Sequence, residues 1–377
     1  MNIQDIRANF PHTAHTIYLN HAATAPLSLR VSAAYQKWIQ ERQNTPIDNY
    51  FQFQQIVDGT RQGLADLIRT TPDRVDVAPN VSVALNYLAQ GFPWKRGDRI
   101  AIPACEFPAN VWPFLHLQRL GVEIDFIPHE QGVFRLEDVE RALTPQTRLL
   151  TISWVQFLSG FRAPLAEIGK LTRERGIWFC VDVIQGSGAL DLGDAEAQGI
   201  DFIAGGGQKW MMADQGIGWF YISKQLQEVV TPPMAGWLSG VVDWDNFFDY
   251  RFNWHEDAMR FRQGTLNNPG IAALHAALGQ YAEAGVSFAH EQTLANAAYL
   301  AQGLAELGFT RYGTDDPGAA SGIVTVSHPD VQGVFDALNQ QQIIISVRNK
   351  LLRFSPTYYN DRVELDRTLA VLADWRI

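Results

Sequence analysis

The chain has 377 residues, 46% of them hydrophobic and 19% charged, which is the composition of a globular protein with a large core. Forty acidic against thirty basic residues give a formal net charge of −10, which argues against a nucleic-acid or anionic-membrane binder. No run of about 18 apolar residues, no secretion-signal pattern and only two cysteines occur, so we expect no membrane span, no disulfide scaffold and a cytoplasmic location.

The first quarter of the chain is predicted to be mostly helical. Apolar residues recur at helical spacing over 27–43 and again over 53–69. A further helix is indicated where Asn80 or Ser82 follows an apolar segment, because both residue types favour the first position of a helix.

From Arg99 onward, short apolar runs alternate with amphipathic segments. Most of the runs are apolar on both faces, as buried parallel strands are. This alternation predicts an α/β fold with a mostly parallel sheet covered by helices. The expected strands are 99–103, 122–128, 148–154, 177–183, 201–205 and 218–222, and the expected helices are 110–120, 136–143 and 165–176.

After Phe261 the pattern changes to an α+β tail. We therefore predict a large α/β domain over residues 16–260 and a small α+β domain built from residues 1–15 and 261–377. The tail's expected helices are 271–285, 286–308, 331–341 and 363–375, and its expected strands are 322–329, 343–348 and 351–356.

Several common cofactor and catalytic signatures are missing from the sequence. No GxGxxG stands at a strand–helix junction, and no GxxxxGK[ST] phosphate loop occurs. There is no HExxH, no GxSxG and no CxxC. We therefore expect neither a dinucleotide-binding motif nor a metal site.

Three features instead follow predicted strands or begin a helix in the order expected for a pyridoxal phosphate site. Asp182 ends an apolar strand, where a carboxylate can pair with a protonated pyridine nitrogen. Lys209 is the one lysine of six that follows a strand and a glycine-rich turn, a setting that lowers an amine pKa. The helix start at Asn80 or Ser82 offers free amides to a phosphate. Taken singly, each has an ordinary alternative: a turn cap, a solvated lysine and a helix cap.

Motifs along most of the chain extend this pattern. They include YLNHAATAPL (18–27), CEFPANVWP (105–113), SWVQFLSGFR (153–162), FRQGTLNNPGIAAL (261–274) and LLRFSPTYYN (351–360). With these motifs the chain resembles the class V aminotransferase family of fold-type I pyridoxal phosphate enzymes. This group also contains cysteine desulfurases, kynureninases and isopenicillin N epimerase-like proteins. The resemblance implies pyridoxal 5′-phosphate as cofactor and a homodimer with active sites at the interface.

By this resemblance, four residues would surround the cofactor ring. Lys209 would form the internal aldimine and later move the α-proton, while Asp182 would pair with the ring nitrogen. Gln185 would contact the ring oxygen, and Phe107 would stack on the ring face as in kynureninase-like members. Without the motif, a plain core residue would be the favoured interpretation of Phe107.

The cofactor phosphate would be held by a second group. Ser82 would bind it together with the amides of Val81 and Val83. Thr265 would reach the phosphate of the neighbouring subunit's cofactor, although it could also serve only as a helix cap. Gln208 stands before the lysine, where the family often has His or Tyr, so phosphate binding is expected to depend more on the other residues.

A third group would bind an amino acid substrate. Arg353 matches the arginine that binds the substrate α-carboxylate, with Arg348 as the alternative. Arg353 could instead be the partner of a structural ion pair. Asn20, His21 and Trp237 align with further pocket positions of the family.

The expected activity is transamination of a small α-amino acid. The alternatives are a kynureninase-like C–C or C–S lyase, an epimerase and, from a different class, a catalytically silent binding module. No cysteine follows Cys180, whereas desulfurases carry a persulfide-forming cysteine in their small domain, so a desulfurase mechanism is not expected.

Overall fold

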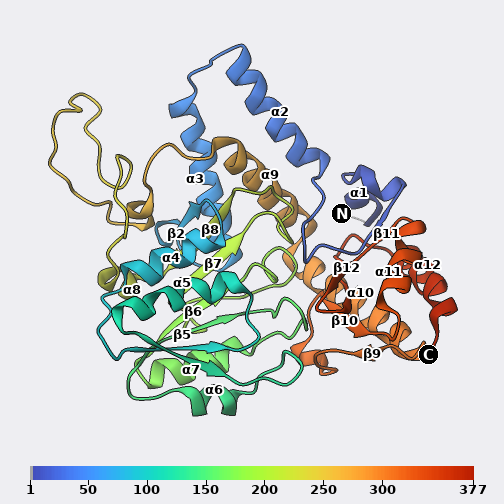
Figure 1. Cartoon of the computed structure of the whole chain (residues 1–377). Coiled ribbons are helices and arrows are strands. Elements are labelled where there is room, and N and C mark those ends of the chain that lie inside the picture. Colours follow the sequence, from blue (N-terminus) through green and yellow to red (C-terminus); the bar gives the residue numbers. More distant parts are fainter. Residues whose placement is uncertain (1–2) are drawn as a thin grey trace.

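The computed structural model describes residues 3–377, and its centre is a seven-stranded sheet (Figure 1). The strand order is β2-β8-β7-β6-β5-β3-β4, and β8 runs antiparallel to both of its neighbours while the other pairs are parallel. The predicted α/β class and mostly parallel sheet are therefore confirmed. The strands are β2 (Val75–Ala78), β3 (Arg99–Pro103), β4 (Glu123–Ile127), β5 (Thr147–Ser153), β6 (Trp178–Asp182), β7 (Phe202–Gly206) and β8 (Gly218–Ile222).

Helices cover both faces of this sheet because successive side chains of its strands point to opposite sides. On one face, Ile100, Ile102 and Phe202 pack with the first set of helices; on the other, Ala101 and Ile203 pack with the second set. The first set is α4 (Val81–Gly91), α5 (Trp112–Leu115) and α8 (Lys224–Val229), and the second is α3 (Tyr50–Leu67), α6 (Leu136–Ala142), α7 (Leu165–Glu174) and α9 (Asn268–Ala284).

In the large unit, two local expectations differ from the structure. The helix expected over 110–120 is divided into α5 and two 3-10 turns, Pro108–Asn110 and His116–Leu120, because a proline at the start of each of the first two segments cannot donate a helical hydrogen bond. Strand β2 was not expected, since it is only four residues long, between the 3-10 turn Pro72–Arg74 and the start of α4.

The C-terminal part forms a smaller unit on the right of Figure 1. Its antiparallel sheet has the order β12-β13-β10-β9, and the short β1 (Ile17–Tyr18) pairs with β11 (Ile343–Ile344) beside it. The other elements of this unit are β9 (Thr310–Arg311), β10 (Val324–Ser327), β12 (Ser346–Arg348), β13 (Leu351–Phe354), α1 (Ile3–Arg7), α10 (Val286–Glu306), α11 (Val331–Gln340) and α12 (Arg362–Leu372). Helix α2 (Leu29–Gln43) instead contributes Val31 to the core of the large unit. In the small unit, the strand expected over 343–348 is divided into two, and the short strands Ile17–Tyr18 and Thr310–Arg311 were not expected.

The hydrophobic cores divide the chain at places other than residues 15 and 260. Helix α9 packs against α2 and α3 and contributes Leu274 to the core of the large unit. Ile17 and Leu19 belong to the core of the small unit. The proposed domain boundaries stay a prediction, and residues 1 and 2 of the expected small domain lie outside the described residues. None of the helices within residues 3–377 has the length and apolar character to cross a bilayer.

Candidate active site

The site lies where the parallel strands of the large sheet end. Asp182 is the last residue of β6 and pairs in register with Ala204 of β7. Lys209 follows β7 by three residues, on a turn closed by a bond from the Met212 amide to the Lys209 carbonyl oxygen (2.9 Å). Ligands of open α/β sheets bind at this edge.

The Lys209 amine has a lowered pKa and no hydrogen-bond partner in the described chain, as a nucleophilic lysine requires. Its side chain is half-buried, and Nζ lies 5.7 Å from the centroid of the Phe107 ring. Burial lowers the pKa of Lys209; the neighbouring Asp182 opposes this, and Arg353 and Arg348 lower it further. Within the described chain, Nζ makes no hydrogen bond or ion pair, so a neutral amine is free to react with an aldehyde.

Asp182 has one oxygen held and one oxygen open. The Ile184 amide donates to Oδ1 at 2.9 Å, whereas Oδ2 has no hydrogen-bond partner among residues 3–377. Burial raises the pKa of this carboxyl group, and Lys209 opposes the rise. A buried carboxylate with an open oxygen fits the protonated nitrogen of a pyridine ring.

The start of α4 provides the anion site, but with fewer donors than expected. The side chain of Asn80 accepts a hydrogen bond from the Val83 amide (2.9 Å), so that amide is already used as a helix cap. The expected role of Val83 is therefore not supported by the geometry. The amides of Val81 and Ser82 stay outside the helical hydrogen-bond ladder, as the first amides of a helix do. Ser82 is exposed, with its hydroxyl group available.

Thr265 and Gln208 lie near this end of the site. Exposed Thr265 lines a cavity together with Ala78 and Pro79, the two residues that precede the α4 cap. The carbonyl oxygen of Gln208 accepts a bond from the Ala25 amide (2.9 Å). A Cβ at Gly206 would lie 2.8 Å from both the Gln208 Oε1 atom and the Ile184 Cδ1 atom, so a larger residue at 206 would require these side chains to shift.

Two predicted polar residues are largely committed to the protein itself. The Gln185 amide donates to the Ala22 carbonyl oxygen (3.0 Å) and accepts from Trp210 Nε1 (2.9 Å), which leaves one N–H for a ring oxygen. His21 is fully buried, and its two ring nitrogens contact the Ser355 carbonyl oxygen (3.0 Å) and the Tyr359 hydroxyl group (2.6 Å). Burial lowers the pKa of His21 to about 3. His21 therefore supports the pocket and has no ring nitrogen left for substrate.

Arg353 is the strongest candidate for binding a substrate carboxylate. It is 2% exposed, and its Nη1 donates to the Phe157 carbonyl oxygen (2.7 Å). Burial and the nearby Arg348 lower the pKa of Arg353 to about 10. No acidic side chain pairs with it in the described structure, which excludes the alternative of a structural ion pair there. Arg348 is exposed and donates to the carbonyl oxygen of the adjacent Val347, so its side chain is held less firmly in place than that of Arg353.

Asn20 and Trp237 have different settings. The Asn20 Oδ1 atom is buried without a hydrogen-bond partner, as expected of an acceptor that awaits a ligand N–H group. Trp237 contacts Tyr50 and Trp244, with ring centroids 6.4 Å and 6.1 Å apart. Within one chain it belongs to an exposed aromatic segment, and its predicted pocket role stays a prediction.

Sequence reasoning missed two residues of this region, Glu106 and Phe157. The Phe157 ring lies 5.3 Å from that of Phe107 in an edge-to-face contact. Glu106 is buried directly before Phe107. The available signal was an acidic residue between apolar neighbours in the segment 105–113.

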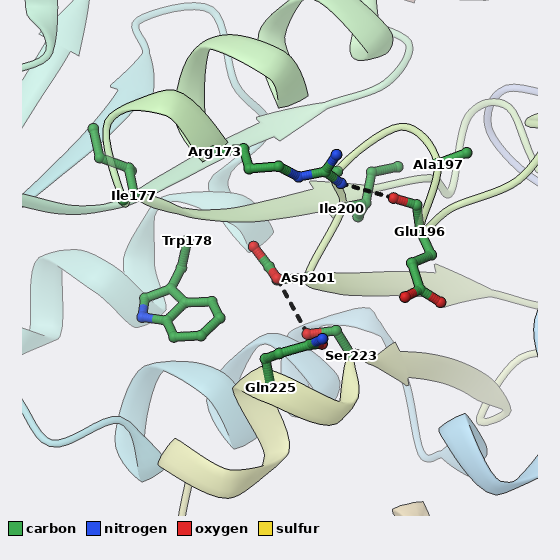
Figure 2. Close-up of a pocket in the computed structure, with 11 residues that line it drawn as sticks. Arg173, Ile177, Trp178, Glu196, Ala197, Ile200, Asp201, Ser223 and Gln225 are labelled. Carbon is green, nitrogen blue, oxygen red and sulfur yellow. Dashed lines mark hydrogen bonds between the residues drawn. The ribbon is translucent and has the colours of Figure 1, made fainter.

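A cavity of about 560 Å³ lies at the opposite edge of the sheet and is separate from this site (Figure 2). It is lined by Trp178 at the amino end of β6, by Asp201 ahead of β7 and by Ser223 after β8. The Ser223 hydroxyl group donates to Asp201, and Arg173 donates to the Glu196 carbonyl oxygen. These groups hold loops together at the edge remote from Lys209.

Comparison with known proteins agrees with the geometry. The family model "Aminotransferase class-V" matches residues 17–366. A probable cysteine desulfurase of Pyrococcus abyssi is 26% identical over 98% of this chain and 97% of its own. The apo structure of a cysteine desulfurase from Thermococcus onnurineus has a TM-score of 0.90 at 24% identity and covers 100% of this chain and 98% of its own.

A second solved structure is informative about the cofactor. The cystine C-S lyase C-DES, in complex with its product cysteine persulfide, has a TM-score of 0.89 at 26% identity and covers 98% of this chain and 100% of its own. A Lys-to-Ala variant of C-DES carries glycine covalently linked to its pyridoxal phosphate. The family match confirms the resemblance stated from the motifs, the fold type I class and pyridoxal phosphate as the cofactor.

Lys209→Ala should abolish covalent attachment of pyridoxal phosphate, because Lys209 is the one lysine on the turn that directly follows β7. Borohydride reduction followed by intact-mass measurement should find the phosphopyridoxyl adduct on the native chain and not on the variant. Lys224→Ala, at an exposed lysine of α8, is the matched control and should keep the adduct. An adduct on the Lys209→Ala chain would remove Lys209 from its assigned role.

Proposed function

The chain belongs to the class V aminotransferase family, and from this premise we propose that it is a C–S lyase acting on a sulfur-containing α-amino acid. The products would be a thiol or persulfide, pyruvate and ammonium. The relatives reported above favour this reaction over the transamination expected from the sequence, since they are called cysteine desulfurases or a cystine C-S lyase.

The two cysteines distinguish a desulfurase, which transfers the substrate sulfur to a cysteine of the enzyme, from a lyase, which releases that sulfur with the product. Cys180 is fully buried in β6, and Cys105 is half-buried after β3. Burial and the nearby Glu106 raise the pKa of Cys105 to about 12, and burial raises that of Cys180 as well. Neither thiol offers a thiolate that could accept sulfur. The sulfur atom must therefore leave with the product.

The side chains of the site supply the remaining steps. Pyridoxal phosphate, when bound, supplies an electron sink for the pair left on the substrate α-carbon. Arg353 holds the α-carboxylate and so orients the α C–H bond, and Asp182 holds the proton on the ring nitrogen. The Lys209 amine takes the α-proton, and the sulfur at the β-carbon departs as the C–S bond breaks. In balance, RS–CH₂–CH(NH₃⁺)–COO⁻ and water give RSH, pyruvate and ammonium.

Product analysis distinguishes the reactions of this family. With cystine or cysteine, we expect pyruvate and ammonium in equal amounts, together with persulfide or sulfide. Alanine as the carbon product would identify a desulfurase instead. Conversion of the cofactor to its pyridoxamine form in a single turnover, without sulfur release, would identify a transaminase and overturn the proposal.

Arg353→Ala should raise KM about ten- to a hundredfold, since a hydrogen bond to a charged group contributes about 1.5–3 kcal/mol. Arg353→Lys keeps the positive charge but not the two parallel hydrogen bonds, so its KM should lie between those of Arg353→Ala and the native enzyme. Arg348→Ala should have a much smaller effect, because that side chain is exposed. A KM unchanged in Arg353→Ala and raised in Arg348→Ala would reverse the assignment.

We also propose that the active form is a homodimer, supported by an aromatic arm over residues 237–252. The arm projects from the large unit at the upper left of Figure 1, between α8 and the turn before α9. Phe248 and Tyr250 are each 83% exposed, and Trp244, Phe247 and Phe252 are exposed as well. An apolar patch of this extent on a chain with its own core marks a protein interface. A second copy is the partner that brings exposed Thr265 toward another cofactor site.

Sedimentation velocity tests the dimer. The native protein should sediment as twice its chain mass of 42.2 kDa at micromolar concentration. Phe248→Ser combined with Tyr250→Ser should weaken the dimer, whereas Val363→Ser, at an exposed apolar residue of α12, should not. A native protein that sediments as a monomer would contradict the proposal.

A further inference from the structure

Two of the four buried acidic residues in the described chain lack a basic partner. Asp76 pairs with Arg262 (2.7 Å) and Glu364 pairs with Arg7 (2.9 Å). Asp182 and Glu106 make no such ion pair within residues 3–377. A buried carboxylate without a counter-ion is costly, so its surroundings must stabilise it in another way. For Asp182 the cofactor ring supplies the partner, which leaves Glu106 unexplained.

Glu106 lies beneath the candidate site and is surrounded by hydrogen-bond donors. It is 9% exposed and follows β3, on the segment that leads to Phe107. The Ser153 amide (2.6 Å) and Gln156 Nε2 (2.7 Å) donate to Oε1. The Ser153 hydroxyl group and Asn110 Nδ2 (3.2 Å) donate to Oε2. The Asn110 amide is oriented by Thr151, whose hydroxyl group donates to its oxygen at 2.6 Å.

This arrangement favours the ionised form of Glu106. Each carboxylate oxygen receives two hydrogen bonds, and none of its contacts requires Glu106 to donate one. Burial raises the pKa of Glu106, and these hydrogen bonds from Ser153, Gln156 and Asn110 oppose the rise. Charge-assisted hydrogen bonds of this kind are about twice as strong as neutral ones.

The Glu106 charge reaches the cofactor through Asp182. Ser153, which donates two bonds to Glu106, is the register partner of Asp182 across β5 and β6. The titratable groups around the pair are Lys209 beside Asp182 and the buried thiols of Cys105 and Cys180. Both thiols stay protonated at neutral pH, so Lys209 is the one titrating cation that faces Asp182.

We propose that Glu106 is a positioning residue: a carboxylate, ionised at neutral pH and held by four hydrogen-bond donors, that acts through Asp182 and makes the ionised form of Asp182 depend on a cationic partner. Two like charges at neighbouring strand ends disfavour an ionised Asp182 on its own. A protonated ring nitrogen would supply the positive charge that stabilises ionised Asp182 beside Glu106. Glu106 thereby selects the protonated cofactor ring, whichever reaction the family member performs, and the inference does not depend on the proposed lyase activity.

The test is Glu106→Gln in the holoenzyme, read by cofactor affinity and by the visible spectrum as functions of pH. The substitution keeps the shape and removes the charge, so Asp182 should stay ionised to lower pH. The acid limb of each curve is the pH range in which affinity or absorbance changes as Asp182 becomes protonated. The midpoint of this limb should shift to a pH about one unit lower. Ser153→Ala, which removes one donor and leaves the charge in place, is the matched control and should leave the limb near its native position.

A double-mutant comparison separates this role from a structural one. In an Asp182→Asn background, Glu106→Gln should cause no further shift of the limb, because the residue through which it acts is gone. A folded Glu106→Gln variant with the native acid limb would overturn the proposal, even if its activity fell. Since the readout is cofactor binding and not product, the result is independent of whether cystine is a substrate.

If Glu106→Gln fails to fold, infrared spectroscopy of the native holoenzyme decides. Protein carrying ¹³C-carboxyl-labelled glutamate should show no label-sensitive band from a protonated buried carboxyl group at neutral pH. Such a band would place a proton on Glu106 and overturn the proposal. Its absence would support an ionised Glu106.

Discussion

The site depends on burying charged groups that the chain itself does not neutralise. Arg353 has no acidic partner, Lys209 has a free amine, and Asp182 has an open oxygen. Each of these groups lowers the stability of the empty protein, because a buried charge lacks the solvation that water provides. Under the proposed function, each of the three would face one group of the substrate or cofactor: carboxylate, aldehyde and pyridine nitrogen.

In this fold, the packed sheet supplies a rigid support, and the candidate site residues lie on the strand ends and turns at one edge of it. The seven-stranded sheet has tightly packed side chains on both faces, so the residues at its strand ends have fixed positions. Arg353 arrives from β13 of the small unit, and its bond to the Phe157 carbonyl oxygen joins it to the turn after β5. Elements far apart in the sequence are therefore held together by a few hydrogen bonds at the edge of the large sheet.

Regular elements with a clear apolar period could be predicted from the sequence. Strand β8 was located at its observed residues, but its antiparallel direction was not evident, since a strand buried on both faces looks the same in either direction. The helix expected over 110–120 failed because local prolines outweighed the apolar spacing. Helix α9 was placed with the small domain, although its apolar side packs against α2 and α3, because sequence order does not reveal which core a helix joins.

The same limit applies to the site. Asp182 ends one apolar strand and Lys209 follows another, so local pattern was sufficient to propose them as site residues. Glu106 could not be found in this way, because its importance comes from Ser153 and Gln156, nearly fifty residues away in the sequence. His21 had the residue type of a catalytic group, yet both of its nitrogens are used within the core. What separates these cases is the set of hydrogen-bond partners, and those partners exist only in the folded chain.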